Sequence, residues 1–170
     1  YICYKEIPKG IDAFDDANRL IFMTGPITAS GAPACSRFEV ISKSPVNNLL
    51  GAANSGGFFG PELKLSGYDG LIFQGKAKEP VFLVINQGVP ELKDASELWG
   101  LDTFETEDKI REILNDKSFR IASIGPAGEN LVKFAAIIND RGRALGRCGM
   151  GAVMGSKNLK AIACKRIKGN

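Results

Sequence analysis

Short apolar runs bounded by glycine, proline or polar residues make up much of this chain, a pattern typical of β-strands. Four such runs in the first half predict strands at Arg19–Thr24, Phe38–Ser42, Leu71–Gln74 and Val81–Ile85. The dipeptide Gln87-Gly88 predicts a hairpin turn from the last of these into Glu91–Lys93. The glycine-rich stretch Gly56–Leu65 predicts the entry to a short helix, because its proline is tolerated in a first helical turn.

One segment, Thr103–Asn115, has a clear helical pattern. Thr103 can cap its start, acidic residues crowd its first turns, and Ile110, Ile113 and Leu114 form an apolar stripe. We expect a helix whose role is packing.

The second half of the chain repeats the order of features in the first half. In each half, an apolar strand ends in Gly-Pro, a second strand opens with a basic residue and Phe, a glycine-rich turn leads into a short helix, and an apolar strand follows. These features begin at Arg19 and Arg120, Arg37 and Lys133, Ser55 and Cys148, and Gly70 and Ala161. Chance recurrence of common dipeptides is the alternative, and the matching order favours a true repeat.

The repeat predicts a fold built from two copies of one β–loop–β–loop–α–β unit, with the Thr103–Asn115 helix between the copies. Two copies of one unit usually pack about a pseudo-twofold axis. The glycine-rich loops Ala52–Gly57 and Arg143–Gly149 would then face each other. Such a pair of loops could hold a ligand that has approximate twofold symmetry itself.

Composition narrows the class of protein. At 170 residues, 44% hydrophobic and 24% charged, the chain is long enough for the core of one globular domain. A net charge of +3 argues against a protein that coats nucleic acid or a membrane surface, and no run is long enough to span a membrane. No signal peptide is visible, which favours the cytoplasm. Both ends of the chain are expected to continue into a longer polypeptide.

Metal-ligating side chains are scarce. The chain has no histidine, which removes the commonest general base and metal ligand. Its four cysteines, Cys3, Cys35, Cys148 and Cys164, show no C-x-x-C spacing, so the sequence predicts free thiols and neither a zinc site nor a complete iron–sulfur site. A bound metal would therefore need a ligand that brings its own donor atoms, or residues on another chain segment.

The most informative stretch is Asn139–Lys160, in which Arg141, Arg143 and Arg147 alternate with several glycines. Arginine offers a fork of donors that fits phosphate, and glycine lets backbone amides approach an anion. The stretch lacks the strand directly before its first glycine that a dinucleotide fingerprint requires, and its Gly-Ser-Lys order does not match a phosphate-binding P-loop. A stand-alone nucleotide-binding module stays open as an alternative.

Longer motifs give a specific resemblance. The segments TGPITASGAPACSRFEVISKSP, ANSGGFFGPELKLSGYDGLIFQGKA, DASELWG and SIGPAGENLVKFAAIINDRGRALGRCGMGAVMGSKNLKAIA resemble the N-terminal domain of the tungsten-containing aldehyde:ferredoxin oxidoreductase family. The resemblance runs from about Leu20 to Ala163 and implies that residues 1–170 form a single platform domain for a tungsten bis-pterin cofactor. The fold that the resemblance implies is α+β, with two β-rich internal repeats that form a sandwich-like base with few short helices. The family's first strands and its downstream helical, cluster-binding domains would lie outside this chain.

The resemblance also implies a set of cofactor-binding residues. Carried over position by position, they are Arg37, Asn54, Gly56, Arg143, Ala144, Gly146 and Arg147. Backbone carbonyls of Asn54 and Ala144 would hold a magnesium ion that bridges two pterin phosphates. No catalytic residue is expected in this part of the protein. Cys35 and Cys148 stand beside such arginines, where they are expected to be tolerated as small side chains; contact of a cysteine with a pterin is the alternative. Leu145 is expected only to pack.

The activity implied for the full-length protein is oxidation of an aldehyde to a carboxylic acid, with ferredoxin as electron acceptor through a 4Fe-4S cluster that this chain does not ligate. Molybdenum is the alternative metal. The expected partners are ferredoxin, a small aldehyde and the remaining domains of the polypeptide; a homodimer stays open. Besides the nucleotide-binding module, the other alternative is a structural domain of the same fold that has lost its cofactor.

Overall fold

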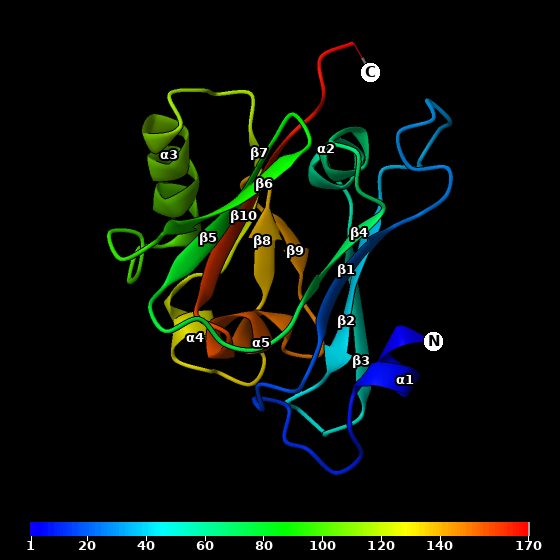
Figure 1. Ribbon diagram of the computed structural model, residues 1–170, viewed down its shortest axis with the longest axis vertical. Helices are drawn as coiled ribbons and strands as arrows, with labels where there is room; N and C mark the ends of the chain where they lie inside the picture. The colour runs from blue at the N-terminus through cyan, green and yellow to red at the C-terminus, as the bar shows by residue number, and fades with distance from the viewer. Residues whose placement is uncertain (170) are drawn as a thin grey trace.

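The computed structural model describes residues 1–169, which form two β-sheets and five short helices (Figure 1). The four-stranded sheet has the order β3-β2-β1-β4 and the six-stranded sheet the order β6-β5-β10-β7-β8-β9. The strands are β1 Leu20–Thr24, β2 Phe38–Lys43, β3 Leu50–Ser55, β4 Gly70–Phe73, β5 Val81–Asn86, β6 Val89–Asp94, β7 Arg120–Ser123, β8 Ile137–Asn139, β9 Arg143–Leu145 and β10 Leu159–Lys165. The helices are α1 Ile2–Glu6, α2 Phe59–Leu65, α3 Thr103–Ile113, α4 Pro126–Glu129 and α5 Met150–Ser156.

The internal repeat is visible in the strand pairing. The first repeat, β1-β2-β3-α2-β4, and the second, β7-β8-β9-α5-β10, have the same antiparallel neighbours in the same order. A line of paired residues across the first sheet joins Met23, Glu39 and Asn54, and its counterpart in the second joins Ser123, Ile138 and Ala144. The predicted α+β fold with two β-rich repeats is therefore confirmed.

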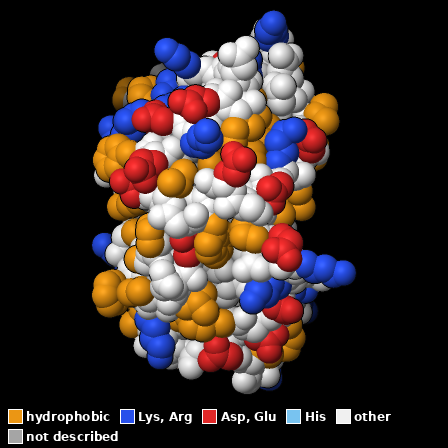
Figure 2. Space-filling view, turned by 90° about the vertical axis from the view of Figure 1, so that its left-hand side faces the viewer, with side chains coloured by type: hydrophobic (Ala, Val, Ile, Leu, Met, Phe, Trp, Pro, Cys, Tyr) orange, Lys and Arg blue, Asp and Glu red, His pale blue; other side chains and the backbone are white. Residues whose placement is uncertain are grey.

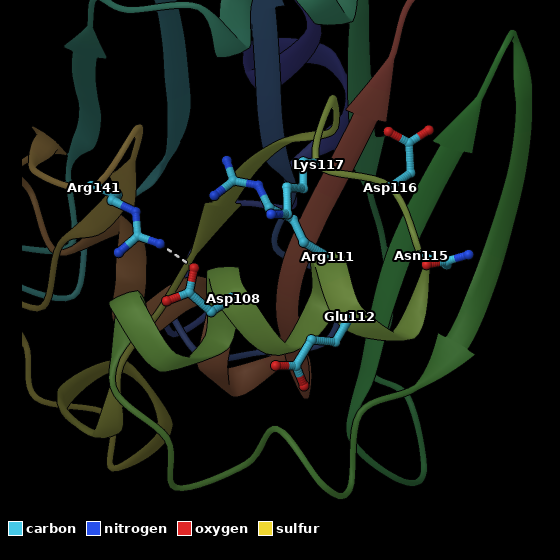
Figure 3. Close-up of a pocket in the computed structure, with 7 residues that line it drawn as sticks. All are labelled: Asp108, Arg111, Glu112, Asn115, Asp116, Lys117 and Arg141. Atoms are coloured by element: carbon cyan, nitrogen blue, oxygen red, sulfur yellow. Dashed lines mark hydrogen bonds and ion pairs between the residues drawn. The ribbon is translucent and has the colours of Figure 1, made fainter.

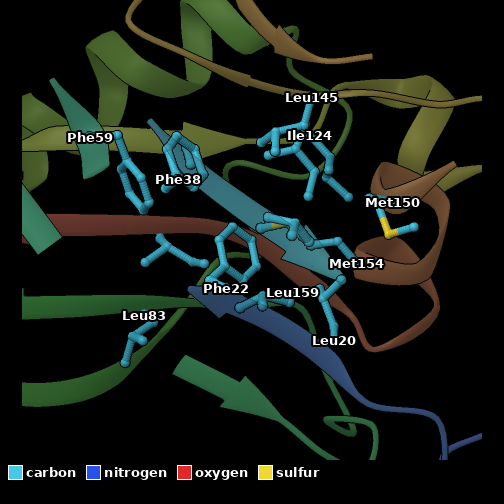
Figure 4. Packing of buried hydrophobic residues seen from close by; sticks show 14 of the residues in the cluster. Leu20, Phe22, Phe38, Phe59, Leu83, Ile124, Leu145, Met150, Met154 and Leu159 are labelled. Carbon is cyan, nitrogen blue, oxygen red and sulfur yellow. The ribbon is translucent and has the colours of Figure 1, made fainter. Parts of the chain in front are cut away.

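The two sheets share one apolar core (Figure 4). Strand β2 alternates buried and half-buried residues, which turns Phe38 and Val40 inward against Phe22 and Phe59. Helices α2 and α5 both contact strands of both sheets, so each helps to close the space between them. Leu145 is completely buried in this core, in agreement with its expected packing role. Closure of the core fixes the sheets relative to each other.

A second, smaller core lies on the other face of the six-stranded sheet. Helix α3 covers this face and packs Ile110 against Phe119 and Ile121 (Figure 1). The helix itself was predicted correctly, but its cap was not. The Asp102 carboxylate accepts hydrogen bonds from the backbone amides of Phe104 and Glu105, while the Glu105 side chain accepts one from the Asp102 amide. This reciprocal capping box makes Asp102 the N-cap and leaves Thr103 as the first helical residue.

The capping box leads to a stability prediction. Asp102→Ala leaves two backbone amides of the first turn without their acceptor, so we expect a loss of about 1 kcal/mol in unfolding free energy. Thr103→Ala is the matched control and should cost clearly less. Urea unfolding of both variants measures the difference. Equal costs would contradict the assignment of Asp102 as the N-cap.

Other local predictions need correction. The segments expected as facing loops are partly strands: Ala52–Gly57 includes most of β3, and Arg143–Gly149 begins with β9. Strand β3 reads Leu-Gly-Ala-Ala-Asn-Ser, without a β-branched or aromatic residue, so its strand conformation comes from pairing with β2 and not from local propensity. The strand expected from Lys133 begins only at Ile137. The predicted hairpin turn is correct, with positive φ at Gln87 and Gly88.

Candidate functional site

The edges of the two sheets meet at β3 and β9. These strands lie against each other, and each forms the end of the strand order within its own repeat. Asn54 and Ala144, the two positions predicted to offer carbonyls to magnesium, are exposed and occupy equivalent places in the paired registers. The repeat thus places these two residues at matching positions on the adjacent edges of the two sheets.

Four of the predicted residues converge at this edge. The Arg37 guanidinium donates a hydrogen bond to Oδ1 of Asn54. A Cβ atom placed on Gly56 would lie 3.7 Å from Nη1 of Arg143 and 3.9 Å from Nη1 of Arg37. Two guanidinium groups, one from each repeat, therefore come together over a glycine that has no side chain. This arrangement concentrates positive charge beside a glycine.

The arginine cluster, Arg37 and Arg143, differs from most other arginines of the chain in its ion pairing. Five of the eight arginines form ion pairs with carboxylates. Within residues 1–169, Arg37, Arg143 and Arg147 form none, and all three are exposed. Guanidinium groups without a carboxylate are suited to an external anion, and their planar fork of donors matches phosphate oxygens.

The remaining predicted residues follow on β9 and the segment after it. Gly146 and Arg147 are exposed, and a Cβ on Gly146 would lie 3.7 Å from that of Ala144. The next residue, Cys148, is fixed by the first repeat, since its carbonyl accepts a 2.9 Å hydrogen bond from Oγ of Ser44. In the part of the chain that the structure describes, no hydrogen bond joins the Arg147 guanidinium to Arg37 or Asn54. Arg147 therefore lies beside the arginine cluster, on the segment that follows β9.

The residues at this edge fit a phosphorylated cofactor. The donor set consists of guanidinium groups and glycine-rich backbone, which is chemistry for phosphate oxygens. Residues 1–169 contain no group of three or more His, Cys, Asp or Glu side chains that could hold a metal. A metal at this edge would therefore take its ligands from the cofactor and from backbone carbonyls, as magnesium does when it binds phosphates.

Sequence reasoning missed three residues at this edge: Ser55, Asn139 and Asp140. Oγ of Ser55 donates a 2.8 Å hydrogen bond to Oδ1 of Asn139, whose Nδ2 donates to the Gly56 carbonyl at 3.0 Å. Oδ2 of Asp140 accepts a 2.5 Å hydrogen bond from the backbone amide of Phe58. The only signal in the sequence was an Asn-Asp pair before a turn, which by itself indicates no more than the turn.

The cysteines behave as the sequence predicted, as free thiols. Cys164 is completely buried in the main core, and this burial raises the pKa of its thiol well above the usual range. Burial also raises the pKa of Cys3. Cys35 and Cys148 are half-buried near the arginine cluster, where each thiol contacts a backbone carbonyl.

Lys157, the lysine of the Gly-Ser-Lys sequence, does not reach toward a ligand. It is 4% exposed, and its Nζ donates to the carbonyl of Gly75 at 3.1 Å and to that of Asp16 at 3.4 Å. A lysine held inside the fold cannot pair with the phosphates of a nucleotide at the Gly149 turn. This geometry argues against the nucleotide-binding alternative.

Lys157 leads to a prediction about pH. Burial lowers its pKa to about 8 from an ordinary 10.5. Between these values the unfolded chain binds more protons than the folded one, so this group makes stability rise with pH, by up to about 3 kcal/mol in total. We expect Lys157→Met to remove this rise when urea unfolding is measured from pH 8 to 10.5. The exposed Lys117→Met should keep the wild-type slope, and an unchanged slope in Lys157→Met would contradict the prediction.

A large cavity lies elsewhere, beside α3. It has a volume of about 630 Å³ and is lined by Asp108, Arg111, Glu112, Asn115, Asp116, Lys117 and Arg141 (Figure 3). Its arginines pair with carboxylates, since Arg141 bonds to Asp108 and Arg111 to Glu107. Figure 2 shows basic and acidic side chains interspersed on the face that carries α3. This cavity has no unbalanced charge comparable to that of the arginine cluster.

A known protein family matches almost the whole length of this chain. The aldehyde ferredoxin oxidoreductase N-terminal domain matches residues 1–166. The chain belongs to this family. It is 52% identical over 168 residues to the tungsten-containing aldehyde ferredoxin oxidoreductase of Pyrococcus horikoshii, an alignment that covers 99% of the chain and 28% of that relative. The family predicted from the sequence motifs is therefore confirmed.

Two further relatives are more distant in sequence. The chain is 37% identical to the aliphatic sulfonate oxidoreductase, WOR-like subunit, of Pyrococcus furiosus, with 97% of the chain and 28% of the relative covered. In the solved active-site complex of benzoyl coenzyme A reductase with 1,5-dienoyl-CoA, a chain at 41% identity superposes with a TM-score of 0.95 over 98% of this chain and 25% of its own length. The chain thus spans about a quarter of the length of these relatives. None of the helices in residues 1–169 is long and apolar enough to cross a membrane.

Proposed function

We propose that this chain is the platform domain on which a full-length, tungsten-containing oxidoreductase holds a bis-pterin cofactor. The observation that carries the proposal is the convergence of Arg37 and Arg143 over Gly56, with no carboxylate partner for either guanidinium within the described residues. Four relatives at 48–52% identity, from three Pyrococcus species and Thermococcus kodakarensis, are named as tungsten-containing aldehyde ferredoxin oxidoreductases, which supports the choice of metal.

In this proposal the two repeats bind the two phosphorylated halves of the cofactor. Arg37, Arg143 and Arg147 neutralise the phosphates, and the lack of a side chain at Gly56 and Gly146 lets the ligand approach the backbone closely. The carbonyls of Asn54 and Ala144 complete the coordination of a bridging magnesium ion. When bound, the cofactor supplies the redox chemistry, and this domain supplies orientation and charge balance.

The proposed activity of the full-length protein is oxidation of an aldehyde to a carboxylic acid, with electrons passed through a 4Fe-4S cluster to ferredoxin. The cluster ligands and the acid–base residues would come from other domains of the same polypeptide. The high-identity relatives named as aldehyde ferredoxin oxidoreductases support this substrate class over the sulfonate named for the more distant relative.

The experiment is direct analysis of the purified full-length protein. We expect about one tungsten and two pterins per chain, and reduction of ferredoxin that depends on an aldehyde. Full occupancy with molybdenum would overturn the choice of metal. Absence of both metals and of pterin from active protein would overturn the platform role, and so would saturable nucleotide binding at the Gly149 turn.

A further inference from the structure

Arg37 and Arg143, the two arginines that meet over Gly56, come from different repeats. A short segment of the second repeat lies next to Arg143 and contacts the first repeat. The segment is the turn between β8 and β9, closed by the strand pair Asn139–Arg143. Its first two turn residues, Asp140 and Arg141, have positive φ angles of 46° and 60°. Because the turn is so short, whatever fixes the side chain of Asn139 also fixes the backbone position of Arg143.

Asn139 is fixed by the end of β3. Its side chain is almost completely buried, with its Oδ1 accepting from Ser55 at 2.8 Å and its Nδ2 donating to the Gly56 carbonyl at 3.0 Å. Both bonds reach the first repeat, more than eighty positions away in the sequence. The amide thus ties the backbone beside Gly56 to the strand that carries Arg143.

Asp140 forms a second connection between the two repeats. Its Oδ2 accepts from the Phe58 amide at 2.5 Å and from Nδ2 of Asn139 at 3.1 Å. Its Oδ1 is buried with no hydrogen-bond partner and lies 3.8 Å from Nη1 of Arg120, whose guanidinium covers the Phe58 ring at 4.9 Å. The carboxylate therefore sits between the start of α2 in one repeat and strand β7 in the other.

Gly57 shows how closely the two repeats approach. It has a φ of +97°, and a Cβ placed on it would lie 2.3 Å from Oδ2 of Asp140 and 2.6 Å from Cδ of Arg143. Only glycine fits this position, both for its conformation and for the space. The contact puts the carboxylate and the aliphatic stem of Arg143 directly against the first repeat.

We propose that Asn139 and Asp140 are positioning residues, which lock Arg143 of the second repeat against Gly56 and Arg37 of the first before the ligand binds. The inference rests on the proposed function and assigns these residues a role that the phosphate-binding groups alone do not supply. A clamp whose halves are already aligned avoids the cost of ordering them on binding, so it retains its ligand longer. The role belongs to the geometry of the side chains and not to the charge of Asp140.

The test compares release of tungsten from variants of the full-length holoprotein, at a temperature well below unfolding. Asn139→Ala and Asp140→Ala should lose tungsten about tenfold faster than the wild type, because each removes buried hydrogen bonds between the repeats. Asp140→Asn keeps an acceptor for the Phe58 amide and should restore slow release. Ser55→Ala, a milder change that removes one bond to Asn139, should give an intermediate rate.

Asn130→Ala is the matched control, since Asn130 also donates its Nδ2 to a backbone carbonyl, that of Pro126 at 2.8 Å, but within its own repeat. It should release tungsten at the wild-type rate. Equal release from all variants would overturn the inference, and so would fast release from Asn130→Ala, which would indicate general loosening. If Arg143→Ala strips the metal while the Asn139, Asp140 and Ser55 variants hold it, only the positioning role fails. If Arg143→Ala also holds it, the proposed platform fails.

Discussion

Replacing Arg143 or Arg147 by alanine should leave the full-length enzyme with less than about a tenth of its tungsten. Each arginine offers charged hydrogen bonds to phosphate, worth roughly 1.5–3 kcal/mol apiece, and this loss converts to a decrease of about 10- to 150-fold in affinity. Elemental analysis of the purified variants measures the metal directly.

Arg141→Ala is the matched control for this prediction. Arg141 is exposed within the same short stretch, but it pairs with Asp108 on the side of α3 and not with the cluster. Its removal should leave the tungsten content unchanged. Normal tungsten in both the Arg143 and Arg147 variants would contradict the phosphate-binding role, while equal loss in all three variants would indicate a general effect of charge.

The second large effect concerns the stability of the fold. Nζ of Lys160 is completely buried, donates to the carbonyl of Leu101 at 2.8 Å, and forms an ion pair with Glu129. The Glu129 carboxylate also accepts from the Gly100 amide. Lys160→Met leaves this carboxylate buried without its cation, which should cost about 3–5 kcal/mol of unfolding free energy in urea.

The double variant Lys160→Met with Glu129→Gln separates loss of the lysine from loss of charge balance. The amide keeps an acceptor for Gly100 and carries no charge, so the double variant should recover much of the lost stability. Equal destabilisation in the single and double variants would show that the charge balance is unimportant.

The sequence was enough to predict the family and the repeat, because both depend on local patterns of residues. Apolar runs ending in Gly-Pro, glycine-rich turns and basic residues recur in the same order, and the strand pairing follows that order. The errors arose where tertiary contacts decide the conformation. Strand β3 has little intrinsic preference for a strand and is held by β2, and the cap of α3 moved by one residue because Asp102 binds two amides.

By itself, the sequence determined the family, the twofold repeat and which arginines are candidates for binding phosphate. Only the tertiary structure decided which of these arginines are available to bind an external anion. Arg141 and Arg143 are two residues apart, yet one is paired with Asp108 and the other points to Gly56 without a carboxylate partner in residues 1–169. The tertiary structure alone also revealed that Asn139 and Asp140 join the repeats. The physical reason is that ion pairs and buried hydrogen bonds form between segments distant in sequence, whose meeting depends on how the two sheets pack.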